Sequence, residues 1–114
     1  MHRIFSIAVA DVYPHYVTKV EKKGRTVAEL DEVLTWLTGF DTATLHQHLE
    51  DKTTFQDFFE AADMVPEAEL ITGSICGVKV QEIEDPLMRK IRQMDKVVDE
   101  LAKGKAVEKI QRSA

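Results

Sequence analysis

The sequence predicts a mainly α-helical protein: one compact bundle of about five helices, with a short two-stranded ribbon as an optional addition. Three observations predict this class: apolar side chains recur every three or four residues, capping residues precede several of these runs, and glycines follow them. A chain of 114 residues suits one domain, residues 1–114, that buries roughly 65% of its unfolded surface. We expect residues 105–114 to form a frayed tail.

The first helix is expected to start at Pro14, because the fixed φ of proline suits the first turn of a helix. We expect it to run to Lys23 and to stop at Gly24. Its apolar face consists of Val12, Tyr13, Tyr16, Val17 and Val20.

The second helix has the clearest local signals. Thr26 and Glu29 form a capping box, and Gly39 follows the last helical residue. Its apolar residues share an arc of roughly 120°, and Trp36 lies about 60° beyond the edge of that arc. We therefore interpret Trp36 as a rim residue that packs across a boundary between helices, with ligand stacking as the alternative. The residues of the arc are Val27, Leu30, Val33, Leu34 and Leu37.

Two further helices are expected in the middle of the chain. Leu45 and Leu49 indicate a short helix after Asp41 or Thr42. Thr53 and Gln56 form a second capping box, followed by apolar positions at helical spacing that we interpret as core: Phe55, Phe58, Phe59 and Ala62.

Residues 71–83 allow two interpretations. Alternation in residues 78–81 indicates a strand, which could pair with residues 5–9 as a ribbon near residues 4–9 and 75–80. The spacing of Gly73, Gly77 and Ile83 instead suits a helix-turn-helix. Because acidic residues follow the turn, phosphates would repel that second helix, and we do not expect duplex DNA as a partner.

The longest helix is expected to start at Pro86, capped by Asp85. Apolar residues then form a seam of barely two heptads, which is short for a coiled coil. We expect the seam to pack on this chain's own core, with a homodimer as the alternative. The seam consists of Leu87, Ile91, Met94, Val98 and Leu101.

Charge separates the ends of the chain from its middle. The net charge is −5, but residues 1–25 and 86–114 are basic and residues 26–85 are acidic. Basic end helices packed beside acidic middle helices would explain this pattern without a function. The functional interpretation is a binding surface for an anionic small molecule or protein partner. Its residues are His15, Lys19, Lys22, Lys23 and Arg25, with Trp36 as a further candidate.

Motifs for catalysis or cofactors are missing from the sequence. His46 and His48 are two residues apart, about 200° around a helix, so they cannot share a metal from one face. We expect neither a metal nor a cofactor. A small enzyme with a site around Cys76 or His15, completed at a dimer interface, is the alternative to a non-catalytic binding module that uses the basic helix face or the long C-terminal helix.

A cytoplasmic location is expected. The apolar run from Ile4 to Ala10 is short for an export signal, and no segment approaches the ~18 apolar residues that a membrane span requires.

Four blocks of the sequence resemble the uncharacterised bacterial family filed as domain of unknown function 2200. They are YPHYVTKVEKKGRT, WLTGF, ITGSICGVKVQEIEDPLMRKI and DELAKGKAVEKI, and the likeness covers about residues 2 to 111. The resemblance implies a small, mainly helical, intracellular bacterial domain. It implies no activity, and no functional residue can be carried over from it.

Overall fold

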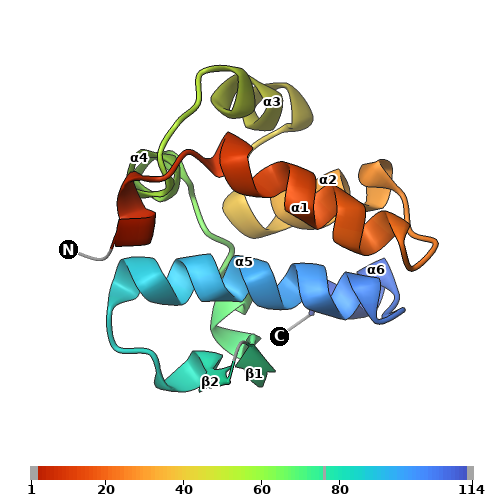
Figure 1. Ribbon diagram of the computed structural model, residues 1–114. Coiled ribbons are helices and arrows are strands. Elements are labelled where there is room, and N and C mark those ends of the chain that lie inside the picture. Colours follow the sequence, from red (N-terminus) through yellow and green to blue (C-terminus); the bar gives the residue numbers. More distant parts are fainter. Residues whose placement is uncertain (1–2, 76, 113–114) are drawn as a thin grey trace.

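The long helix α5 runs across the molecule, and the other elements pack around it in the computed structural model (Figure 1). The structure describes residues 3–75 and 77–112. Within these residues the chain forms six α-helices, three 3-10 helices and one two-stranded sheet. In chain order these are η1 (Arg3–Ser6), α1 (Val9–Glu21), α2 (Val27–Thr38), α3 (Thr42–Glu50), α4 (Phe55–Ala61), η2 (Pro66–Leu70), β1 (Ser74–Ile75), β2 (Val78–Lys79), η3 (Val80–Glu82), α5 (Pro86–Ala102) and α6 (Val107–Ile110). The predicted fold class is confirmed.

Helix α2 begins and ends where its sequence signals predict. The Thr26 side chain accepts a hydrogen bond from the Glu29 backbone N–H, and the Glu29 carboxylate accepts one from the Thr26 backbone. Gly39 has a φ of 77°, the left-handed conformation that glycine adopts without strain. Trp36 is half-buried and packs against the hydrophobic core, as expected for a rim residue.

Helix α1 begins five residues earlier than predicted, so the expected start at Pro14 is wrong. Pro14 lies inside the helix, where its missing N–H leaves the carbonyl of Ala10 without the usual i+4 donor. The first turn is instead fixed by contacts with the segment before α4: Val9 donates to the Thr53 carbonyl, and Ala8 forms an isolated antiparallel bridge with Thr54. The helix ends at Glu21.

Three buried phenylalanines of α4 form part of the core, as predicted. Phe55, Phe58 and Phe59 are each at most 2% exposed, and Phe58 contacts Phe59 edge to face. The cap is one residue later than predicted, because Thr54 accepts from the backbone of Asp57. The Thr53 hydroxyl instead bonds to the imidazole of His48.

The segment 71–83 contains a hairpin, so the strand predicted in residues 78–81 is confirmed in part, whereas its predicted partner and the helix-turn-helix are wrong. Strands β1 and β2 pair antiparallel, with Ser74 opposite Lys79 and Ile75 opposite Val78. Residues 3–6 form η1 and are not the partner strand, and η3 follows β2 directly, so there is no helix-turn-helix. A local turn brings adjacent residues together at a smaller entropic cost than pairing with the distant N-terminus.

The apolar seam of α5 packs on this chain's own core. Ile91, Met94, Val98 and Leu101 are at most 1% exposed, and Leu87 is partly buried against the same core. A homodimer through this seam is therefore contradicted, because these side chains are already covered. In the part of the chain that the structure describes, no helix combines the length and apolar character needed to cross a membrane.

Candidate functional site

The basic stripe predicted on α1 lies on an exposed surface. His15, Lys19, Lys22 and Lys23 are all exposed. Arg25 differs from them, because its guanidinium pairs with Glu29 at 2.8 Å and donates to the carbonyl of Lys105 at 3.0 Å. Arg25 therefore joins the loop after α1 to the loop after α5 and is not free to bind a partner.

Helix α5 adds lysines to the stripe. Asp99 is 8% exposed, and its carboxylate lies 3.1 Å from Lys19 Nζ, 3.0 Å from Lys103 Nζ and 3.9 Å from Lys96 Nζ. Burial alone would raise the pKa of Asp99, but hydrogen bonds from Lys103 and Lys19 outweigh it and hold the pKa below its ordinary value. One carboxylate thus faces three ammonium groups, which leaves an excess of positive charge.

The carboxyl ends of α1 and α5 lie at the same end of the molecule. The two helices run side by side in the same direction (Figure 1). Lys22 and Lys23 follow α1 at this end, and neither has an ion-pair partner within residues 3–75 and 77–112. We call Lys19, Lys22, Lys23 and Lys103 the basic end. The basic segments of the sequence therefore meet in space, in addition to their contacts with the acidic helix α2.

Trp36 does not belong to the basic end. It lies ten residues into α2 from the cap Thr26, about 15 Å along the helix axis. The ring packs against the core, so the structure brings together the lysines of the predicted site but not the tryptophan.

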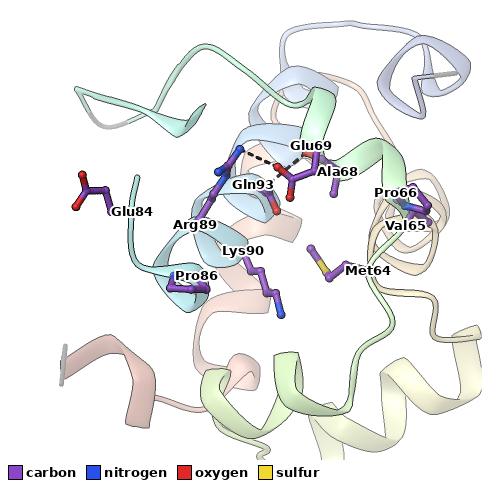
Figure 2. Close-up of a pocket in the computed structure, with 10 residues that line it drawn as sticks. All are labelled: Met64, Val65, Pro66, Ala68, Glu69, Glu84, Pro86, Arg89, Lys90 and Gln93. Atoms are coloured by element: carbon purple, nitrogen blue, oxygen red, sulfur yellow. Dashed lines mark hydrogen bonds and ion pairs between the residues drawn. The ribbon is translucent and has the colours of Figure 1, made fainter. Parts of the chain in front are cut away.

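A second surface feature is a cavity of about 340 Å³ beside the first turns of α5 (Figure 2). One wall consists of Met64, Val65, Pro66, Ala68 and Glu69. The other consists of Glu84 and, from α5, Pro86, Arg89, Lys90 and Gln93. The Arg89 guanidinium pairs with Glu69 at 2.8 Å across the opening. No sequence pattern predicts this cavity, because its two walls are some twenty residues apart along the chain.

A third cluster joins α1, α2 and α3. Asp31, 9% exposed, accepts a hydrogen bond of 2.5 Å from the Tyr13 hydroxyl, and its second oxygen lies 2.8 Å from His46 Nε2. Burial, and then the hydrogen bond to Asp31, raise the pKa of Tyr13 well above its ordinary value. The spacing of His46 and His48 predicts only a surface position for His46. The sequence signal for this cluster is Asp31, because it lies only about 40° around α2 from the edge of the apolar arc, where a carboxylate is close enough to the core to need a partner.

The described residues add little support for the alternative that the protein is a small enzyme with a site around Cys76 or His15. Cys76 lies outside them, so a reactive thiol there stays a prediction. His15 is exposed on α1. No group of three or more His, Cys, Asp or Glu side chains within residues 3–75 and 77–112 could hold a metal ion.

Comparison with known proteins places the chain in a family. No curated protein matches it. A crystal structure of "uncharacterized protein SP1917" is 41% identical in sequence to this chain, covers 96% of it and 91% of its own length, and superposes with a TM-score of 0.90. The family model DUF2200, described as "uncharacterized protein conserved in bacteria", matches residues 3–112. The chain therefore belongs to this bacterial family.

Proposed function

We propose that this protein is a small, non-catalytic binding module of the bacterial cytoplasm, and that its basic end binds an acidic surface of another protein. The observation that carries the proposal is the excess of lysine at one end of a protein with a net charge of −5. The lysines come from two helices that are far apart in sequence and adjacent in space.

The charge balance supports an anionic partner. Asp99 is shared among Lys19, Lys96 and Lys103, so it neutralises one of three positive charges. Lys22 and Lys23 add two more charges without ion pairs in the described part of the chain. Positive charge concentrated in this way attracts anions and speeds their association.

Exposure favours a protein partner over a small ligand. The side chains of Lys19 and Lys103 are 44% and 72% exposed. A small anion gains little from exposed lysines, because each such pair is worth about 0–1 kcal/mol and salt screens it. Many weak contacts over a broad acidic surface together give useful affinity and specificity.

A cytoplasmic location agrees with the cysteine content. The chain has one cysteine, so no disulfide within it contributes to its stability.

The test is an NMR titration of the 15N-labelled protein with a ten-residue glutamate peptide at low salt. We expect amide shifts in the last turn of α1 and around Lys103, and we expect them to weaken as salt is added. Inorganic phosphate and single-stranded RNA serve as comparison ligands, and each should bind more weakly than the peptide.

A double variant, Lys22→Glu with Lys23→Glu, should abolish these shifts. The control is Lys52→Glu with Lys79→Glu, which makes the same change in net charge at two exposed lysines, one in the turn after α3 and one in β2. Equal loss in both variants would show that only net charge matters. Absence of shifts at millimolar peptide, or stronger binding of RNA than of peptide, would refute the proposal.

A further inference from the structure

The cavity beside α5 has the dimensions of a small-molecule site. Its volume of about 340 Å³ lies at the lower end of the range for ligand pockets, roughly 300–1,000 Å³. Figure 2 shows Met64, Pro66 and Val65 on one side and Pro86 on the other, so apolar groups face each other across the opening. Such a cavity suits a ligand with an apolar body.

Arg89 supplies a polar group that is incompletely satisfied. Its Nη2 donates to the carboxylate of Glu69 at 2.8 Å, whereas its Nε is buried and has no hydrogen-bond partner within the described residues. A buried N–H without an acceptor costs free energy. The Glu69 side chain is 71% exposed, so its pair with Arg89 is a weak surface contact that an incoming anion can replace.

The other polar side chains that line the cavity are Glu84, Lys90 and Gln93. In Figure 2 the Glu84 carboxylate points away from Arg89 and Lys90. Lys90 lines this cavity and a smaller adjoining one near Phe59, and it has no ion-pair partner in the part of the chain that the structure describes. Gln93 is 2% exposed and donates from Nε2 to the Ala68 carbonyl at 3.1 Å. Its Oε1 accepts no hydrogen bond from any described residue. With the Glu84 carboxylate turned away, the cavity offers an anion two cations, of which Arg89 is paired with Glu69, and offers a donor one carbonyl oxygen.

We propose that this cavity binds a small carboxylic acid with an apolar body and a hydroxyl or amino group next to the carboxylate. The ligand carboxylate displaces Glu69 and accepts from Nη2 of Arg89. A rotation of the guanidinium, which Glu69 then no longer holds, brings the buried Nε to the second carboxylate oxygen, the side-by-side geometry that guanidinium groups favour. Lys90 adds a second positive charge, and the hydroxyl or amino group donates to Gln93 Oε1. The apolar body lies against Met64, Val65 and Pro86.

This site is separate from the basic end, and neither proposal depends on the other. The cavity uses residues 64–69 and the first turns of α5, whereas the basic end lies at the opposite end of α5. The variant Lys22→Glu with Lys23→Glu should therefore leave binding in the cavity unchanged.

The test uses 3-phenyllactate as the probe, in an NMR titration of the full chain. We expect shifts in residues 64–69 and 86–93, weaker binding of 3-phenylpropanoate, which lacks the hydroxyl, and no binding of the uncharged methyl ester of phenyllactate. Arg89→Lys keeps the charge but removes the paired donors, and it should weaken binding about tenfold.

Glu69→Ala gives the sharpest result, because it removes the competing carboxylate and should tighten binding by about three- to tenfold. Glu67→Ala is the matched control: it removes the same charge from η2 at a residue that does not line the cavity. Equal affinity of the two glutamate variants would overturn the proposal. Shifts confined to other residues would also overturn the proposal. So would the absence of binding at roughly 10 mM probe, which would mean a binding free energy of less than about 3 kcal/mol.

Discussion

The cluster of Tyr13, Asp31 and His46 allows a quantitative test of what holds α1, α2 and α3 together. We expect Asp31→Ala to lower the free energy of unfolding by about 2–4 kcal/mol. The hydrogen bond from Tyr13 to a charged, largely buried acceptor accounts for about 1.5–3 kcal/mol. The pair with His46, whose side chain is 44% exposed, adds at most about 1 kcal/mol.

A double-mutant cycle separates the two contacts. Urea unfolding at pH 7 is measured for the native chain, Tyr13→Phe, Asp31→Ala and the double variant. We expect a coupling energy of about 2 kcal/mol between Tyr13 and Asp31, and a matching cycle with His46→Ala should give less than about 1 kcal/mol. A Tyr13–Asp31 coupling below about 0.5 kcal/mol would refute this account, because the hydrogen bond would then contribute nothing beyond packing.

Alkaline pH gives a second measurement of the same cluster. Burial and the bond to Asp31 raise the folded-state pKa of Tyr13 above the ordinary value of 10.0, so the folded phenol keeps its proton where the unfolded one loses it. The stability from this group is complete below pH 10 and is lost as the pH rises above 10. Tyr13→Phe should therefore lose less stability than the native chain between pH 9 and pH 11 (roughly one unit either side of the ordinary value).

Three further predictions concern the core, a turn and the lysine-bound carboxylate. Phe58→Ala should cost about 3–5 kcal/mol in urea unfolding because the ring is fully buried, whereas Leu70→Ala, 45% exposed, should cost less than about 1 kcal/mol. Gly39→Ala should lower the stability more than Gly24→Ala, as measured by thermal unfolding. Both glycines have a positive φ, but a Cβ at Gly39 would lie 2.5 Å from a backbone oxygen, whereas nothing lies within 4 Å of one at Gly24. Asp99 has a lowered pKa in the folded state, so its stabilising effect is present above the ordinary value of 3.8 and is lost as the pH falls below it. Asp99→Asn should therefore lose less stability than the native chain between pH 6 and pH 2, roughly two units either side of that value. An equal loss in both proteins would contradict the stabilising role of the Asp99 carboxylate.

Signals that act within one turn of helix were predictable from the sequence. The capping box of Thr26 and Glu29, the stop at Gly39 and the cap at Asp85 all depend on residues at most four positions apart. Pro14 shows where local signals fail. Its preference for a first turn is overridden by the bond from Val9 to the Thr53 carbonyl, a contact between segments more than forty residues apart.

The candidate sites were harder to predict for the same reason. Periodicity shows which face of a helix is apolar, but not which helices become neighbours. The helical spacing predicts that Lys19 is exposed and basic, yet its partner Asp99 is eighty positions away and follows only from the packing of α1 beside α5. The cavity beside Arg89 depends on η2 packing near α5, a placement that no motif encodes.

Helix dipoles are an alternative explanation for the basic end that needs no partner, since lysines favour the carboxyl ends of helices, and α1 and α5 both end there. Each helix end carries about half a negative elementary charge, so the two ends supply roughly one, and Asp99 supplies a second. Lys19, Lys22, Lys23 and Lys103 carry four positive charges. Glu21 does not correct the balance, because it lies about 160° around α1 from Lys19. About two positive charges remain in excess, and these are the charges that the proposed acidic partner would neutralise.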